Sequence, residues 1–450
     1  MFRRSFFSLL LLTALAGHVA IAQETAPATT YPAPLAKVEL QDGDSIVFLG
    51  DSITHQRLYT QYVEDFFYTR FPHIRLKIHN AGVGGARAID ALDRFEKDVV
   101  AYKPKYVTIL LGMNDGTYQA YNEEVFRTYE RDMTTLLDKI AESGAKAIPM
   151  TPTMFDYRAV LLKPGRRDPA KLQLYNSVLA YYGMFLQEKA YERGLGFVDM
   201  YTPLNHITWE QRKTDPNFTL IADAVHPGAN GQVVMATALI EGIGLKGPLS
   251  SATIRQTPKG KWAATSKGTK VSEITGDEQN LSFTLTADAL PWVLPAEAKL
   301  GSELTHLGQQ FSRESLSVVG LPPGTYRLTI DDIEVGTYGA RQLATGIQLQ
   351  NNEKTPQYQQ ALKVAELNKK RNEGPIGNLR GEWARFQGYA RAKRDNNQEN
   401  IAKIEPLIQT MDERVAAANA QAKEIEDQIF QINQPQPHKY VLTLVPAEKK

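Results

Sequence analysis

From residue 36 to about residue 247, short apolar runs alternate with segments whose apolar residues recur at helical spacing. This alternation predicts a mostly parallel sheet with helices on both of its faces. The predicted strands are 45–50, 75–80, 106–112, 145–152 and 195–200. The predicted helices lie near 57–72, 87–101, 122–142, 170–193 and 230–243. Ligands of such sheets bind beyond the carboxyl ends of the strands, so residues that follow strands are the first candidates for a site.

After residue 247 the pattern changes, and apolar and polar residues alternate one by one between Pro-Gly and Asp-Asp turns. This alternation predicts a small antiparallel β domain over residues 248–450. A segment at about 352–436 interrupts it, and between 401 and 432 its apolar residues recur at alternating spacings of three and four. That heptad pattern predicts a helical hairpin inserted in the β domain, with residues 379–390 as the facing stretch. A coiled coil between two chains would show the same pattern, so self-association through 401–432 stays open.

The N-terminus has the features of a secretory signal peptide. Arg3 and Arg4 precede an apolar run, and small residues end the segment at Ala22. We expect residues 1–22 to be removed after Ala22 and the protein to be secreted or periplasmic. The Pro- and Thr-rich residues 23–35 form a predicted flexible leader, and no run is long enough to predict stable membrane insertion.

Composition narrows the possible partners. The chain of 450 residues has a formal net charge of +1 and no cysteine. A net charge near zero gives no electrostatic reason to expect nucleic acid as a partner. Without disulfides, stability must come from the core that a chain of this length can bury.

Four polar segments follow predicted strands or precede the last predicted helix of the first domain. They are GDSIT at 50–54, NAGVGG at 80–85, GMND at 112–115 and DAVH at 223–226. Each has an ordinary structural interpretation, since Gly, Asp, Asn and Ser are common in turns and Ser52 is a candidate helix cap. A dinucleotide-binding interpretation of the second segment is weak, because Arg87 stands where a third glycine is needed.

Together, the four segments supply the groups that acyl transfer needs. Ser52 is the candidate nucleophile, His226 its general base, and Asp223 the carboxylate that orients the imidazole. An oxyanion hole needs preorganised donors, which the backbone N–H groups of Ser52 and Gly85 and the side-chain amide of Asn114 can supply.

These segments resemble, in the same order, the motif blocks of the SGNH (GDSL-like) hydrolases, and the resemblance covers roughly residues 44–245. It implies a flavodoxin-like three-layer α/β/α fold for the hydrolase domain at 36–247. It also implies ester hydrolysis through an acyl-serine intermediate, with no metal or organic cofactor. The C-terminal region resembles an appendage of exported SGNH proteins from environmental bacteria.

The substrate is less constrained by the sequence. An exported enzyme with a β accessory domain favours removal of acetyl or similar small acyl groups from carbohydrate. A lipid or thioester hydrolase and a non-catalytic binding or scaffold protein remain the alternatives. In the stretch after the fourth strand, Phe155, Tyr157 and Arg158 are candidate substrate contacts. Since 352–436 lies outside the motif blocks, we expect its deletion to leave turnover of small esters intact.

Overall fold

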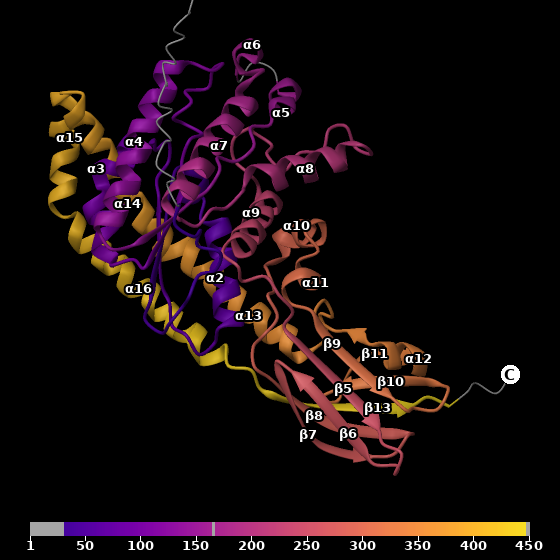
Figure 1. The fold of residues 1–450 in the computed structure, drawn as a ribbon. Coiled ribbons are helices and arrows are strands. Elements are labelled where there is room, and N and C mark those ends of the chain that lie inside the picture. The colour runs from indigo at the N-terminus through magenta and orange to yellow at the C-terminus, as the bar shows by residue number, and fades with distance from the viewer. Residues whose placement is uncertain (1–30, 164–166, 447–450) are drawn as a thin grey trace, which may run out of the picture.

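The computed structural model describes residues 31–163 and 167–446. The predicted signal peptide and residues 23–30 of the predicted leader lie outside the described residues. Figure 1 shows an α/β region followed by a β region, with long helices in orange and yellow running along one side of the α/β region. Among the described residues, no helix combines the length and the apolar character that crossing a membrane requires.

A four-stranded parallel sheet forms the centre of the α/β region. Its order is β2 (Lys77–Gly82), β1 (Ser45–Gly50), β3 (Tyr106–Leu110) and β4 (Lys146–Pro149). All three strand pairs are parallel. The predicted α/β class and the first four predicted strands are therefore confirmed. All six residues of β1 are buried, because helices cover both faces of the sheet.

The fifth predicted strand, 195–200, is wrong as a full strand. Only Val198 pairs with the sheet, as an isolated parallel bridge to Met150 beside β4. The chain leaves the sheet almost at once, because helix α8 (Tyr201–Arg212) begins three residues later. The bridge still places this segment next to β4, so the spatial order remains that of a flavodoxin-like sheet.

Helices fill the layers on either side of the sheet. α2 (Leu58–Arg70) packs on α9 (Ala229–Gly242), and α3 (Ala88–Asp98) packs on α4 (Glu123–Glu142). Because β1 crosses to β2 on one side and β2 returns to β3 on the other, right-handed connections place these pairs on opposite faces. The predicted helix at 170–193 is divided into α6 (Pro169–Leu172) and α7 (Tyr175–Arg193). The short helix α5 (Tyr157–Leu162) and α8 are additional to the predicted helices.

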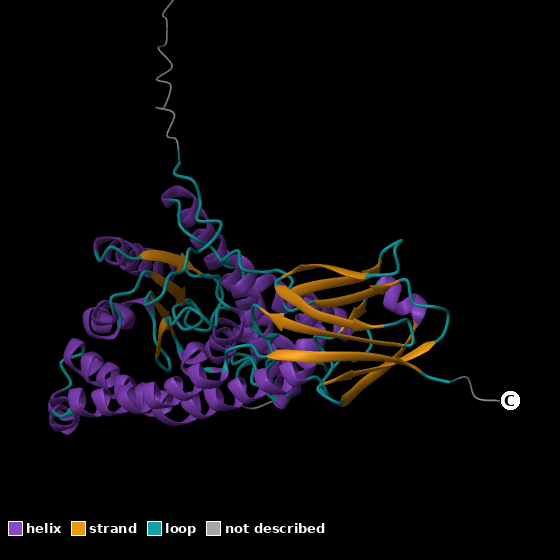
Figure 2. Ribbon diagram, turned by 90° about the horizontal axis from the view of Figure 1, so that it is seen from below, coloured by secondary structure: helices purple, strands orange, loops and turns teal. Residues whose placement is uncertain are grey.

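The β region consists of two sheets that share one apolar core. The first has the order β11, β10, β13, β8, β7, and the second has the order β12, β9, β5, β6. Figure 2 shows their strands gathered at one end of the molecule. The bounds are β5 (Ser250–Gln256), β6 (Trp262–Lys267), β7 (Thr269–Gly276), β8 (Asn280–Ala287), β9 (Glu314–Val319), β10 (Thr325–Ile330), β11 (Ile333–Gly339), β12 (Ile347–Gln348) and β13 (Pro437–Leu444). One pair, β5 with β9, is parallel, so the region is not purely antiparallel as predicted.

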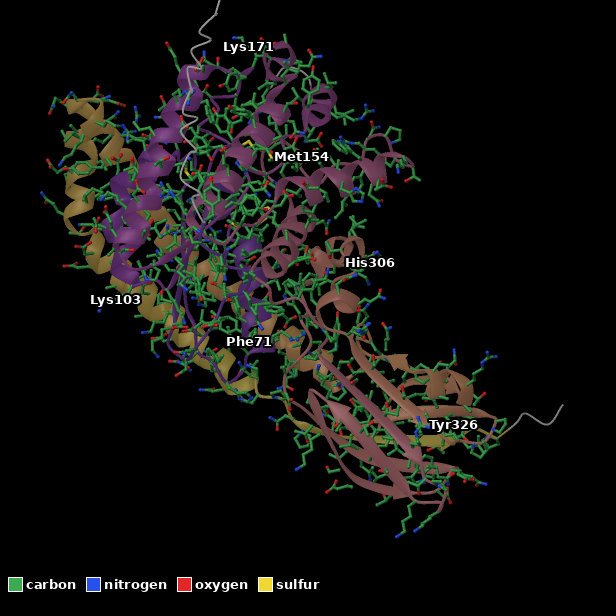
Figure 3. The ribbon with its side chains drawn as sticks, viewed as in Figure 1. Phe71, Lys103, Met154, Lys171, His306 and Tyr326 are labelled. Carbon is green, nitrogen blue, oxygen red and sulfur yellow. The ribbon has the colours of Figure 1, made fainter. Side chains whose placement is uncertain are left out.

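Side chains from both sheets meet in this second core. Tyr326, labelled in Figure 3, is fully buried there and belongs to the same cluster as Val318 of the other sheet. Met154, also labelled, belongs to the separate core of the α/β region.

Four helices lie between β12 and β13, where the sequence predicts a helical insertion. They are α13 (Pro356–Arg371), α14 (Gly377–Arg394), α15 (Gln398–Gln409) and α16 (Met411–Ile432). A single π-helical turn joins α13 to α14. The heptad pattern is not one helix, since Thr410 separates α15 from α16. Both of these helices pack on α14 within the same chain, so the apolar residues of 401–432 have packing partners without a second copy of the chain.

The helical insertion packs directly on the α/β region. α13 contacts α2, and α14 contacts α3 and β2. Leu379 and Trp383 of α14 belong to the same apolar core as the parallel sheet. Buried polar groups also cross the boundary, with Asn368 bonded to Asp65 and Arg371 to Glu64. These contacts argue against the expectation that the segment can be deleted without consequence.

Candidate active site

Ser52 lies at the point where β1 ends and the short helix α1 (Ser52–His55) begins. The helix cap is the preceding residue, since Asp51 Oδ1 accepts a hydrogen bond of 2.8 Å from the Ile53 N–H. The structural interpretation of Ser52 as a helix cap is therefore wrong, because Asp51 caps this helix and the Ser52 hydroxyl does not. As the first residue of the helix, Ser52 also has a backbone N–H with no intrahelical acceptor.

His226 and Asp223 reach Ser52 from the loop before α9. His226 Nε2 lies 2.8 Å from Ser52 Oγ, and His226 Nδ1 lies 2.7 Å from Asp223 Oδ2. Asp223 Oδ1 accepts from the backbone N–H groups of Val225 and His226, which fixes the carboxylate within its own turn. This turn holds Ala224 at φ +75, a left-handed conformation that is costly for a residue with a side chain.

The hydrogen bonds set the direction of donation along this chain of groups. An ionised Asp223 carboxylate can only accept, so Nδ1–H of His226 donates to it, and in the tautomer that acts as a base Nε2 is left to accept from the Ser52 hydroxyl. Partial burial raises the pKa of Asp223, but the bonds from the His226 ring and from the two backbone N–H groups outweigh it, and the net shift is downward. The carboxylate is therefore ionised at neutral pH and suited to stabilise an imidazolium.

Gly85 lies in the loop between β2 and α3, with φ +66. Its backbone N–H donates to no acceptor among the residues that the structure describes. The preceding N–H, that of Gly84, donates to His55 Nδ1 at 3.2 Å. Because His55 accepts this bond, its ring must be neutral, in agreement with a pKa lowered to about 4 by burial and by the neighbouring arginines.

Asn114 follows β3 and connects the loops that hold Ser52 and Gly85. Its Nδ2 donates to the Ala86 carbonyl at 3.1 Å and to Asp51 Oδ2 at 3.4 Å. Tyr118 OH donates to Asn114 Oδ1 at 3.0 Å, which directs the amide NH₂ toward those two loops. The amide therefore contacts Asp51, which precedes Ser52, and Ala86, which follows Gly85.

Two buried carboxyl groups beneath the site were not singled out from the sequence, although both lie in the quoted motifs. Asp115 Oδ1 accepts from the Ala88 N–H at 2.8 Å, and its Oδ2 accepts from the Gly112 N–H at 3.0 Å. Burial raises the pKa of Asp115 and of Asp51 to about 7 in each case. These carboxyl groups tie the motif loops to one another rather than facing a substrate.

One candidate substrate contact is corrected by the structure. Phe155 is 0% exposed, and its ring packs edge-on against Tyr175 with centroids 5.2 Å apart. It therefore fills the core and cannot stack on a sugar. Tyr157 and Arg158 begin α5 and are half-buried and exposed, respectively, so they remain predictions.

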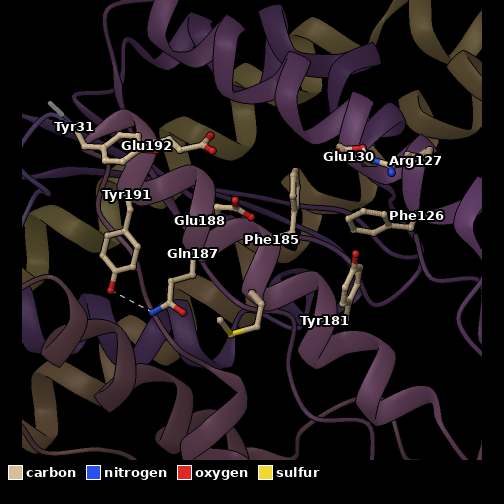
Figure 4. Close-up of a pocket in the computed structure, with 11 residues that line it drawn as sticks. Tyr31, Phe126, Arg127, Glu130, Tyr181, Phe185, Gln187, Glu188, Tyr191 and Glu192 are labelled. Carbon is tan, nitrogen blue, oxygen red and sulfur yellow. Dashed lines mark hydrogen bonds and ion pairs between the residues drawn. The ribbon is translucent and has the colours of Figure 1, made fainter. Parts of the chain in front are cut away.

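A separate hollow lies between α4 and α7 (Figure 4). Tyr181, Glu188 and Tyr191 of α7 line it together with Phe126 and Glu130 of α4. No serine or histidine is among the described residues that line it. It therefore lacks a nucleophile and base pair, and the chemistry is concentrated at the ends of the parallel strands.

Comparison with known proteins agrees with this location. Residues 48–234, which include all five proposed site residues, match the model of the GDSL-like lipase/acylhydrolase family. An acetylxylan esterase of Geobacillus stearothermophilus is 25% identical over 231 residues, which cover 46% of this chain and 98% of that protein. A solved structure of a gut microbial diltiazem-metabolizing enzyme is similar with a TM-score of 0.77 and 25% identity, covering 92% of this chain and 100% of that one. Residues 48–234 therefore form a domain that matches the GDSL-like lipase/acylhydrolase family, and the chain is a carboxylic ester hydrolase.

Proposed function

We propose that this protein is an exported serine esterase that removes acetyl or similar small acyl groups from carbohydrate. The observation that carries the proposal is the continuous chain of hydrogen bonds from Ser52 Oγ through His226 to Asp223, with distances of 2.8 and 2.7 Å. The distance of 2.8 Å between Ser52 and His226 is within the range for proton transfer from a nucleophile to its base, and the 2.7 Å distance lets Asp223 orient that base. Without His226 in this position, a serine hydroxyl would be too weakly nucleophilic to attack an ester.

The proposed reaction has two halves. Ser52 Oγ attacks the ester carbonyl carbon while His226 Nε2 takes the hydroxyl proton, and the carbonyl oxygen becomes an oxyanion. That oxyanion accepts hydrogen bonds from the N–H groups of Ser52 and Gly85 and from the Asn114 amide, which releases its long 3.4 Å bond to Asp51 to make this contact. When the C–O bond breaks, His226 returns the proton to the leaving alcohol and the acyl-serine remains. Water then attacks the acyl group by the same route, releasing the acid and restoring Ser52.

The acetyl and carbohydrate parts of the proposal rest on the comparison with a similar protein. The similar protein from Geobacillus stearothermophilus is named as an acetylxylan esterase, and its likeness spans the region that holds the site. Export is supported by the charged and apolar pattern of residues 1–22.

The test compares wild type with Ser52→Ala on p-nitrophenyl acetate and on acetylated xylan, with acetate release as the readout. We expect turnover in wild type and its loss in Ser52→Ala. Ser177→Ala, at an exposed serine of α7, is the matched control and should keep wild-type turnover. Equal turnover by wild type and Ser52→Ala would contradict the proposal, and inactivity of both would favour a binding protein. A preference for p-nitrophenyl octanoate over the acetate would favour a lipid esterase.

A further inference from the structure

Helix α14 of the helical insertion bonds to the backbone of the loop that carries Gly85. Arg380 donates to the Gly82 carbonyl at 3.3 Å, Gln387 to the Gly84 carbonyl at 3.0 Å, and Arg391 to the Gly85 carbonyl at 2.6 Å. The three donors are spaced by seven and four residues, so they lie along one face of the helix. About 300 residues separate each donor from its acceptor in the sequence.

The bond from Gln387 is the most consequential of the three. The carbonyl of Gly84 and the N–H of Gly85 belong to one peptide unit, which is planar and trans, so the two groups point in opposite directions. A donor that holds the Gly84 carbonyl on the side of α14 therefore directs the Gly85 N–H to the other side. A hydrogen bond to the carbonyl also polarises the peptide and strengthens its N–H as a donor.

The Ala86 N–H donates to the Val83 carbonyl at 3.1 Å and closes a β-turn around this peptide unit, but such a bond forms with the central peptide in either of two opposite orientations. Gly85 has φ +66 and no heavy atom within 4 Å of the position that a Cβ would occupy, so the glycine itself does not restrict rotation. His55 accepts the Gly84 N–H, which belongs to the preceding peptide unit and fixes only that one. The orientation of the Gly84–Gly85 peptide thus depends on the donors of α14.

Ion pairs join α14 to α3, the helix that follows the loop. Arg391 bonds to both carboxylate oxygens of Asp90, and Arg394 bonds to the same carboxylate at 2.8 Å. Asp90 lies in the first turn of α3 and is fully buried. Gln387 is itself 3% exposed, so its amide has no freedom to exchange the carbonyl for bulk water.

We propose that the helical insertion completes the oxyanion hole, with Gln387 as a positioning residue that orients the Gly85 N–H. This inference rests on the proposed function, because it takes Gly85 as an oxyanion donor. Gln387 acts through the peptide and not on the substrate. Its effect should therefore appear in the transition state and not in substrate binding.

The test is Gln387→Met, which keeps the length of the side chain but cannot donate. We expect kcat for p-nitrophenyl acetate to fall about tenfold while KM stays within about twofold, because the oxyanion forms only after substrate is bound. Loss of an entire oxyanion donor lowers kcat by about 10²–10³, so a misdirected donor should have a smaller effect. Inhibition by a boronic acid, which forms a tetrahedral adduct on the nucleophile, should weaken by a similar factor.

The matched control is Gln360→Met. Gln360 of α13 also donates to backbone carbonyls, those of Ile432 and Gln434, but it lies away from the loop. We expect it to lower the melting temperature at least as much as Gln387→Met while leaving kcat unchanged. If Gln387→Met yields no folded protein, Gln387→Leu replaces it, since its apolar side chain also cannot donate.

The outcomes separate the two proposals. Wild-type kcat in Gln387→Met together with an inactive Ser52→Ala would overturn the positioning role and leave the serine mechanism standing. A drop in kcat that Gln360→Met shows equally would also overturn it, since the effect would then be general destabilisation. Turnover that persists in Ser52→Ala would remove the proposed function, and this inference with it.

Discussion

Arg380 Nη2 lies 2.9 Å from Asp98 Oδ1, and neither side chain is exposed to solvent. The pair joins α14 to the last residue of α3, 282 positions apart in the sequence. Burial alone would raise the pKa of Asp98, but Arg380 and His79 together lower it to about 2. The carboxylate is therefore buried in its charged form and depends on its partners.

Arg380→Met should destabilise the fold strongly. It removes one partner and leaves a buried carboxylate with less compensation, a change that typically costs about 3–5 kcal/mol. The free energy of unfolding from urea denaturation measures the loss. Arg385→Met is the control and should cost less than about 1 kcal/mol, because Arg385 is 36% exposed and its partner Glu382 keeps a second ion pair with Arg414. Similar losses in the two variants would contradict the importance of the buried pair.

Asp223→Asn should reduce kcat while leaving the fold intact. The amide cannot stabilise the imidazolium, and it allows the His226 tautomer in which Nε2 is protonated and no longer accepts from Ser52. By comparison with serine hydrolases in general, the loss should be about 10³–10⁴-fold in kcat. Steady-state kinetics on p-nitrophenyl acetate measure it, and circular dichroism should show unchanged structure. A loss smaller than tenfold would mean that another group orients His226.

Asn114→Ala should lower kcat by about 10²–10³ with little change in KM, the expected effect of removing one oxyanion donor. Asn122→Ala is a matched control, since Asn122 caps α4 by accepting from the Val125 N–H at 3.1 Å. The control should lose about 1 kcal/mol of stability with kcat unchanged. A larger change in KM than in kcat for Asn114→Ala would indicate a role in binding the ground state.

Replacing residues 356–432 with a short Gly-Ser linker should abolish soluble activity. This reverses the expectation from the sequence, because α13 and α14 cover part of the α/β core and neutralise Glu64 and Asp98. Soluble yield and melting temperature are the measurements. A soluble variant with wild-type kcat would show that the helices complete neither the fold nor the oxyanion loop.

His79 should make the wild-type fold less stable as the pH falls from about 6.5 to about 4. Burial lowers the pKa of His79 from 6.5 to about 4, so in this window the unfolded chain binds a proton that the folded protein does not. The free energy of unfolding therefore increases with pH in this window, since stability rises with pH wherever the unfolded state binds more protons. The slope due to this group reaches up to about 1.4 kcal/mol per pH unit.

The variant His79→Gln isolates this effect. It keeps a donor for Asp98 but has no titrating ring, so its free energy of unfolding should depend less steeply on pH between 4 and 6.5. His73→Gln, at a histidine exposed before and after unfolding, should follow wild type. Parallel curves for wild type and His79→Gln would show that the ring is protonated in the folded protein.

The parallel sheet and the location of the candidate site could be predicted because both depend on local patterns. Apolar runs separated by helical periods specify parallel strands, and the ends of such strands meet at one edge of the sheet. Ser52 and Asn114 follow from that rule, Asp223 and His226 lie in the loop before the last helix of the domain, and in the structure these loops do meet. The sequence predicts a full strand at 195–200, whereas the structure has only the bridge at Val198, because an apolar run does not reveal how soon the next helix begins.

The direction of a side chain at a loop and the partner of a polar helix were decided by the tertiary structure alone. Phe155 follows a strand just as a substrate contact would, yet it points into the core. Gln387 and Arg380 stand in a segment rich in polar residues, where the local pattern is the same for a solvated face and for a buried contact. The sequence by itself determined which groups could perform ester hydrolysis and the sheet edge at which they gather. Only the folded chain decided that a helix about 300 residues away holds the Gly84–Gly85 peptide, because such a pairing depends on packing between distant elements and leaves no periodic signal along the chain.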